Sequence, residues 1–267
     1  MEKTDSATVD REQIVRGLRG AGITCGDVLL VHSSLKSFGR VRGGADAVID
    51  ALLEAVGPDG LVSVPTHTWG TVNARQPVFH ETLSPSIVGH ITNVFRLRPK
   101  AVRSLHPTHS VAAIGKRARR FIAGQERRVT PCSRKSPYRR LVEWGGKVVF
   151  LGVDLNVMTL MHAFEEWARV PWLFSPRRQE LYVIRRDGRI IKVPSRRHSE
   201  APGLDRAFPS LEPLFRKKGI LRSVRIGKAE VRILEAKPAA GLVVPLLRKD
   251  PDLVLKRRRR GGKAAGV

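Results

Sequence analysis

Two short apolar segments joined by a glycine-rich loop and a helix constrain the fold of this chain most strongly. Residues 28–32 (VLLVH) and 61–65 (LVSVP) are apolar runs with β-branched residues, which is typical of strands buried on both faces. Residues 45–56 (ADAVIDALLEAV) have the apolar period of a helix and end at Gly57 and Pro58. Such a strand–helix–strand unit crosses over right-handed and places its two strands in parallel in one sheet.

Later segments extend this unit. Residues 148–153 (VVFLGV) form the clearest buried strand of the chain, and a helix begins at about His162. Further along, Asp187 and Gly188 stand between two alternating apolar runs, which indicates a β-hairpin. We therefore expect an α/β fold with a central mixed, mostly parallel sheet flanked by helices, and an antiparallel α+β appendage over residues 170–245.

The composition is that of an ordinary globular chain. Of its 267 residues, 42% are hydrophobic and 27% are charged. No apolar run approaches the roughly 20 residues that a membrane span requires, and the first ten residues lack the apolar core of a signal peptide. We therefore expect a cytoplasmic protein without a membrane span. Cys25 and Cys132 lie far apart, which argues against a disulfide framework or a thiolate metal cluster.

The charge of the chain is unusual. Lys and Arg number 49 against 24 Asp and Glu, so the net charge is +25. Such a field favours anionic partners: nucleic acid, an acidic membrane surface or phosphorylated small molecules. The true basic cluster is Lys256–Arg260 (KRRRR). We expect residues 1–247 to form a single domain and residues 248–267 to be a disordered tail that contacts anions or nucleic acid nonspecifically. A basic nucleic-acid-associated protein is accordingly one alternative.

His162 is the strongest candidate for a catalytic residue on position alone. It follows a buried strand by a few residues, at the carboxyl edge of the sheet where ligand sites of α/β proteins lie. Glu165 comes three residues later and would share a helical face with His162. A carboxylate one turn away holds an imidazole in one tautomer and raises its basicity, as a general base requires. The alternative is an ordinary histidine beside an acidic first turn.

Two other sites can be built from the same part of the chain. Imidazole and carboxylate groups of His67, His109, His162 and Glu166 could bind zinc, but their spacing matches no metal motif, so we expect no metal. Residues 32–44 (HSSLKSFGRVRGG) offer hydroxyls and glycines between a strand and a helix, which suits a phosphate group. The loop is neither a Walker loop nor a dinucleotide fingerprint.

Taken together, these segments resemble a known family. The runs VHSSLKSFGRVRGG, LHPTHSVAAIG, SPYRRL, GGKVVFLGV and HAFEEWA occur in the order and spacing of the aminoglycoside 3-N-acetyltransferase family. The similarity extends over about residues 11–172 and more weakly to 245. It implies one α/β domain with a mixed sheet and acetyl-coenzyme A (acetyl-CoA) as donor. It also implies direct acetyl transfer to an amine of an aminoglycoside or a similar compound, in a ternary complex.

The resemblance also assigns residues. The family's catalytic histidine corresponds to His162, and its glutamate corresponds to Glu165. The acid that usually precedes this histidine is missing from its expected place, so Asp154 or Glu165 would orient the imidazole. His109 is a further catalytic candidate that only part of the family shares. Positions near the coenzyme match the serines Ser33, Ser34, Ser37 and Ser136, to which we add Thr66 and Ser110 as candidate oxyanion donors. Both cysteines lie outside the motifs, so we expect no acetyl-cysteine intermediate.

The expected acceptor conflicts with the charge of the chain. Aminoglycosides are polycations, and a protein of net charge +25 repels them unless a local acidic cleft reverses the potential within a Debye length of roughly 8 Å. Candidate residues for such a cleft are Glu81, Asp154, Glu165, Glu166 and Asp205. We expect modest activity on aminoglycosides and a preference for a smaller or less cationic amine.

Overall fold

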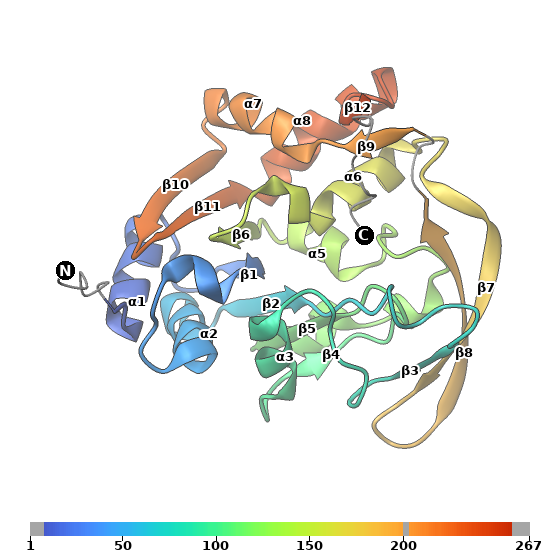
Figure 1. Ribbon diagram of the computed structural model, residues 1–267, viewed down its shortest axis with the longest axis horizontal. Helices are drawn as coiled ribbons and strands as arrows, with labels where there is room; N and C mark the ends of the chain where they lie inside the picture. The colour runs from blue at the N-terminus through green and yellow to red at the C-terminus, as the bar shows by residue number, and fades with distance from the viewer. Residues whose placement is uncertain (1–7, 200–202, 258–267) are drawn as a thin grey trace, which may run out of the picture.

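The structure, a computed structural model, describes residues 8–199 and 203–257. Its main sheet consists of β1 (Val28–Ser33), β2 (Leu61–Pro65), β4 (Val102–Arg103), β5 (Val111–Gly115), β6 (Lys147–Leu151), β10 (Leu221–Ile226) and β11 (Ala229–Glu235). These seven strands lie in the order β10-β11-β6-β1-β2-β5-β4 (Figure 1). β1 pairs in parallel with β2 and with β6, as the strand–helix–strand pattern predicts, and the other neighbours are antiparallel.

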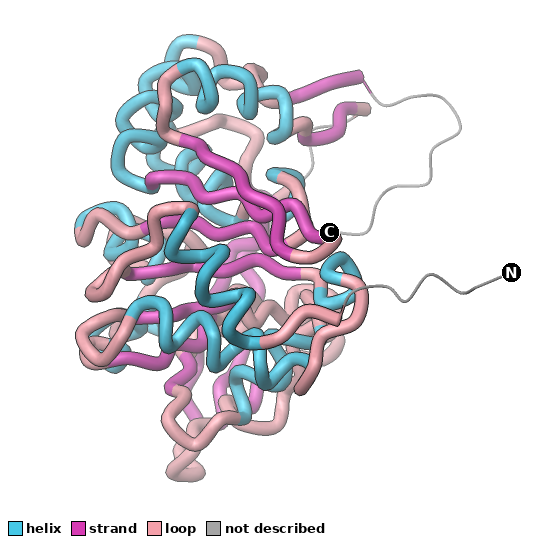
Figure 2. Tube along the Cα trace, turned by 90° about the vertical axis from the view of Figure 1, so that its left-hand side faces the viewer, coloured by secondary structure: helices cyan, strands magenta, loops and turns pink. Residues whose placement is uncertain are grey.

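Helices cover both faces of the main sheet, which Figure 2 shows from the side. One layer contains α1 (Arg11–Gly20), α2 (Gly44–Val56) and α3 (His90–Leu97), and the other contains α4 (Ala118–Ile122), α5 (Pro137–Glu143), α6 (Thr159–Ala168) and α8 (Ala236–Lys249). Along β1, Leu29 and Val31 pack in the first layer and Val28 and Leu30 in the second. An apolar layer on each face explains why β1 lacks the alternation of a half-exposed strand.

Two smaller sheets complete the structure. β3 (Val78–His80) pairs with β7 (Phe174–Ile184), which pairs with β8 (Ile190–His198), and β9 (Leu204–Arg206) pairs with β12 (Leu255–Arg257). The β7–β8 hairpin is the one predicted from sequence, and Gly188 in its turn has a φ of +81°. Near β9, the short helix α7 (Glu212–Lys217) follows the 3₁₀ helix η4 (Phe208–Leu211).

Two topological expectations need correction. The sheet is mixed, as predicted, but it is not mostly parallel, because only the two pairings of β1 are parallel. Residues 170–245 do not form one appendage: β7 and β8 belong to a small sheet, whereas β10 and β11 extend the main sheet beside β6. The alternating apolar residues Val231 and Ile233 of β11 are buried, and β11 covers an edge that β6 would otherwise expose.

The prediction that residues 248–267 form a disordered tail is also partly wrong. α8 continues to Lys249, Val254 is fully buried, and the strand that begins at Leu255 pairs with β9. Residues 248–257 are therefore part of the folded body. Residues 258–267 lie outside the described residues, so their contact with anions or nucleic acid stays a prediction. In the two described ranges, no helix combines the length and apolar character that crossing a bilayer requires.

Candidate active site

A cleft of about 650 Å³ opens at the carboxyl ends of β1, β2 and β6. This is the edge at which ligand sites of open α/β sheets lie, and the volume is in the range of small-molecule sites. Its apolar wall consists of Pro65, Trp69, Ile87, Val88, Val153, Val157 and Met158. Its polar groups come from His32, Ser33, His67, Thr92, His109, Asn156, Thr159 and His162.

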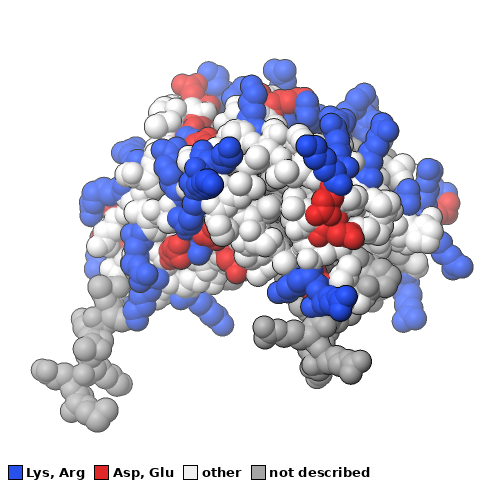
Figure 3. Space-filling view, turned by 90° about the horizontal axis from the view of Figure 1, so that it is seen from above, with Lys and Arg blue, Asp and Glu red and all other residues white. Residues whose placement is uncertain are grey.

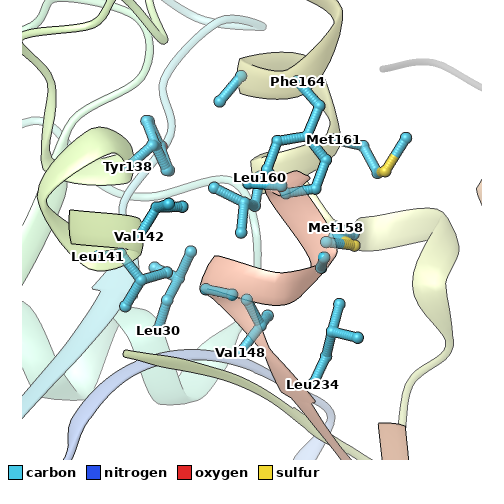
Figure 4. Close-up of a cluster of buried hydrophobic side chains, with 14 of the residues drawn as sticks. Leu30, Tyr138, Leu141, Val142, Val148, Met158, Leu160, Met161, Phe164 and Leu234 are labelled. Atoms are coloured by element: carbon cyan, nitrogen blue, oxygen red, sulfur yellow. The ribbon is translucent and has the colours of Figure 1, made fainter. Parts of the chain in front are cut away.

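Helix α6 presents His162 to this cleft. The helix is anchored by Leu160, Met161 and Phe164, which are fully buried in the core around α5 and β6 (Figure 4). His162 lies between these anchors in sequence and keeps 13% of its side chain exposed. The apolar face of α6 therefore fixes where the imidazole points.

Glu165 connects His162 to a residue that the sequence analysis missed. His162 Nδ1 lies 2.8 Å from Glu165 Oε2, and Arg206 Nε donates to Glu165 Oε1 at 3.1 Å. Glu165 is fully buried. Burial alone would raise the pKa of this carboxyl, but its bonds to His162 and Arg206 bring the pKa below its ordinary value. Glu165 is therefore ionised near neutral pH, and it is placed to orient the imidazole. Asp154 instead accepts hydrogen bonds from Asn156.

The hydrogen bond to Glu165 also defines the tautomer of His162. An ionised carboxylate only accepts, so Nδ1 carries the proton and Nε2 of the neutral ring has a free lone pair. Burial lowers the pKa of His162, the Glu165 hydrogen bond and charge raise it, and the result lies below 6.5. His162 is therefore neutral at pH 7, which is the state a general base needs.

Further histidines surround His162. Ring centroids are 4.7 Å apart for His162 and His198, 5.1 Å for His198 and His109, and 4.7 Å for His109 and His67. Burial lowers the pKa of His67, His109 and His198 well below 6.5, and the neighbouring imidazoles lower it further. The cleft is thus lined by neutral rings. His198 and Arg206 lie in the β7–β9 region, and no local spacing linked them to His162.

The predicted serines have different surroundings. Ser33 lines the cleft, and Ser34, half-buried, directly precedes the 3₁₀ helix η1 (Leu35–Phe38). Ser37 Oγ donates to the carbonyl of Gly152 at 2.7 Å, so it ties η1 to the end of β6. Ser136 is fully buried before α5, outside the residues that line the cleft, and its hydroxyl has no hydrogen-bond partner among the described residues.

Thr66 and Ser110 do not reach the cleft. Both are fully buried, and their hydroxyl oxygens lie 2.9 Å apart. Arg103 Nε donates to both hydroxyls, at 3.2 Å and 3.1 Å. Because this network occupies both side chains away from the cleft, we do not assign them an oxyanion role.

The zinc alternative receives no support. Across the described ranges, no three His, Cys, Asp or Glu side chains are placed to hold a metal ion. Glu166, the carboxylate of that alternative, accepts hydrogen bonds from Thr130 Oγ1 at 2.5 Å and from the Cys132 amide at 3.1 Å. It therefore points toward the loop before α5 rather than to the histidines.

The residues proposed for an acidic cleft are dispersed. Glu81 lies beside a different depression and accepts a hydrogen bond from the Arg186 amide at 2.8 Å. Asp154 caps the 3₁₀ helix η3 (Leu155–Val157), and Asp205 lies in β9. The expectation that these carboxylates form one cleft is wrong, because none of the five is among the described residues that line it.

The residues present fit a coenzyme A molecule. The apolar wall and the Ser33 hydroxyl suit a long, amide-containing arm, and the loop that follows carries exposed cations for phosphate groups at Lys36, Arg40 and Arg42. The sequence analysis expected a phosphate site in this loop from its hydroxyls and glycines and did not name these cations.

The chain is similar to several known proteins. The chain is 33% identical over 180 residues to aminoglycoside N(3)-acetyltransferase VIII of Streptomyces fradiae, covering 61% of this chain and 63% of that protein. The chain thus spans just under two thirds of this relative.

Solved structures match over a larger share. AAC-IIIb in its binary complex with CoASH has a TM-score of 0.80 at 27% identity and covers 91% of this chain and 97% of its own. A mutant of aminoglycoside acetyltransferase AAC(3)-IVa in complex with a gentamicin has a TM-score of 0.81 at 26% identity, covering 94% and 93%. The aminoglycoside 3-N-acetyltransferase family model matches residues 30–248. Because this match covers most of the chain, the protein belongs to the aminoglycoside 3-N-acetyltransferase family.

Proposed function

We propose that this protein is an acyltransferase that moves the acetyl group of acetyl-CoA to an amine of an aminoglycoside or a similar amino compound. Family membership supports the reaction class. One similar structure contains CoASH and another contains a gentamicin, which supports these substrate classes. Acetylation of an aminoglycoside would make the protein an antibiotic-resistance enzyme. The observation that carries the proposal is the His162–Glu165–Arg206 series beside a cleft of suitable size.

The proposed mechanism is direct transfer with His162 as general base. Acetyl-CoA supplies an acyl group activated as a thioester. Nε2 of His162 accepts a proton from the amine as its nitrogen attacks, and the same atom then returns this proton to the leaving sulfur. Glu165 holds Nδ1–H and stabilises the imidazolium that forms in between. Arg206 keeps Glu165 ionised and in place.

The function is tested by measuring thiol release from acetyl-CoA with purified protein and a panel of aminoglycosides and simple amines. Turnover with at least one amine is expected, and a complete absence of turnover would contradict the proposed function.

The role of His162 is tested separately. His162→Ala should lower kcat by about 10²–10⁴, the usual contribution of a general base, without unfolding the chain. The matched control is His90→Ala, because His90 is an exposed histidine outside the cleft lining. Full activity of His162→Ala would remove His162 from the mechanism while leaving the reaction itself intact.

A further inference from the structure

A second concave surface, lined by cations, lies between α3, α4 and the tip of the β7–β8 hairpin. This groove has a volume of about 540 Å³. We call it the basic groove and define it by Lys100, Lys116, Arg117, Arg119, Arg120 and Arg186. All six of these residues are exposed. The described residues that line the groove include no carboxylate.

Most of this positive charge is not neutralised. Lys116 Nζ pairs with Asp59 Oδ1 at 2.8 Å. The other five cations form no ion pair with a described carboxylate. Elsewhere on the surface, Lys and Arg are interspersed with carboxylates, as Figure 3 shows for the face that carries α7 and α8. The basic groove is therefore a local concentration of unpaired cations.

Two of the cations are held in place by an aromatic ring. The guanidinium carbon of Arg117 lies 4.4 Å from the centroid of the Trp144 ring, and that of Arg120 lies 5.7 Å from it. Trp144 is half-buried and packs on Phe121 of α4, with ring centroids 5.7 Å apart. Because stacking restricts both arginines before any ligand arrives, less conformational entropy is lost when an anion binds.

The basic groove lies away from the acetyl-transfer cleft. β2 and β5 are antiparallel, with Pro65 opposite Val111 and Leu61 opposite Gly115. Pro65 lines the cleft, whereas Gly115 lines the basic groove, so the two sites lie toward opposite ends of these strands. The two sites share no lining residue among those described.

We propose that the basic groove is a binding site for consecutive phosphate groups, as presented by a nucleotide or by a nucleic-acid strand. Several cations in one concavity match several phosphates of one ligand better than a single carboxylate. Arg117 and Arg120 would form a fixed cationic wall. Arg119, also on α4, and Lys100 and Arg186, from other elements, would supply the remaining contacts to the ligand. Such binding releases counterions, so the logarithm of the binding constant falls linearly with the logarithm of the salt concentration.

The test compares two triple variants of the full chain. In the groove variant, Lys100→Ala, Arg119→Ala and Arg186→Ala are combined, which leaves the two arginines on Trp144 in place. In the control variant, Lys217→Ala, Lys218→Ala and Lys237→Ala remove the same charge from exposed positions around α7 and α8. Fluorescence anisotropy of a labelled 12-nucleotide RNA is measured across salt concentrations, with ATP and pyrophosphate as competitors.

The groove variant should bind the RNA at least about tenfold more weakly, and its salt slope should fall by about 2 to 3, whereas the control should change less than about twofold. Competition by ATP would identify a nucleotide as the ligand, and RNA binding that ATP does not displace would identify a strand. Equal losses in both variants, or no binding of any probe by the unmodified protein at low salt, would overturn the proposal. The acetyl-transfer rate should be unchanged in both variants.

Discussion

Glu165 remains charged in the interior because two donors surround it. His162 and Arg206 each contact one of its carboxylate oxygens, at 2.8 Å and 3.1 Å. An unpaired buried carboxylate would take up a proton instead. The pair His162 and Glu165 can therefore be read from their spacing, but the ionisation of Glu165 depends on Arg206, which is contributed by β9.

Replacement of Glu165 by Gln should change the pH dependence of the reaction. Glu165 raises the pKa of His162, although burial keeps the resulting pKa below 6.5. Glu165→Gln removes this contribution, so His162 loses its proton at lower pH and the acidic limb of kcat/KM should move to lower pH. We also expect kcat to fall by about tenfold or more, because the imidazolium loses its counter-charge.

Glu166→Gln is the matched control for this pH profile, since Glu166 is the next residue and bonds to Thr130 and Cys132 instead. It should leave the acidic limb where it is. If the acidic limb of kcat/KM stays unchanged in Glu165→Gln, or shifts equally in both variants, Glu165 does not raise the pKa of His162.

Helix α6 carries a second, half-buried carboxylate with the opposite behaviour. Burial raises the pKa of Glu166 from 4.5 to about 7, and its two hydrogen bonds offset only part of this effect. Because the folded pKa lies above the unfolded value, the stability contributed by protonated Glu166 is fully present below pH 4.5 and is lost as the pH rises through about 7.

This predicts a pH-dependent difference between the protein and its Glu166→Gln variant. Relative to the variant, the unmodified protein should lose about 3 kcal/mol of unfolding free energy between pH 4.5 and about pH 8, from a shift of 4.5 to about 7. Urea unfolding at several pH values measures this difference. A difference that does not vary with pH would mean that folding does not shift the pKa of Glu166.

Arg103 joins the main sheet to the small sheet around β3. Its Nη1 donates to the carbonyl of Ser84 at 2.6 Å, and its Nη2 donates to the carbonyl of Thr66 at 2.8 Å. Its guanidinium lies 4.6 Å from the centroid of Phe79 in β3. Burial lowers the pKa of Arg103 to about 9, so the residue is still charged at pH 7. One buried cation thus satisfies backbone carbonyls of two separate segments.

Arg103→Met keeps the apolar length of this side chain but removes its donors. We expect a loss of about 2–4 kcal/mol in unfolding free energy, because the buried carbonyl and hydroxyl groups around Arg103 each lose one hydrogen bond. Arg75→Met is the control, since Arg75 is exposed, and should change stability by less than about 0.5 kcal/mol. Equal stabilities of the two variants in urea unfolding would refute this role of Arg103.

The net charge of +25 bears on the proposed substrates through the field of the whole molecule. This field would attract the anionic acetyl-CoA and repel a polycationic acceptor. Among the described residues that line the cleft, none is a carboxylate, and Glu165 behind it is held by His162 and Arg206.

Two dependences on salt follow. The KM for acetyl-CoA should rise with added salt as the attraction is screened. A monoamine or weakly cationic amine should have a higher kcat/KM than a gentamicin-like polyamine at low ionic strength, and the difference should narrow at high ionic strength. Measuring both acceptors from about 20 mM to about 500 mM salt checks this. Efficient and salt-insensitive turnover of the polyamine would contradict it.

Local pattern alone determined much of the fold. β1, α2 and β2 were predicted correctly because both faces of these strands meet apolar helices, and such burial leaves an unbroken apolar run in the sequence. The β7–β8 hairpin was predicted because its turn needs a residue with positive φ, which Gly188 supplies. The spacing of His162 and Glu165 on one helix likewise predicted their contact.

Only the tertiary structure decided the rest of the site. Arg206 reaches Glu165 from β9, and His198 reaches His162 from β8, across a separation in sequence that no helical or strand period connects. Thr66 and Ser110 turn to Arg103 instead of the cleft because that buried cation needs acceptors. The pairing of β11 with the edge of β6 could not be predicted either. A half-buried strand alternates apolar and polar residues in the same way whether it lies in a separate small sheet or in the main sheet. Contacts between segments far apart in the sequence depend on which surfaces the folded chain brings together. No local pattern in a single sequence specifies those surfaces.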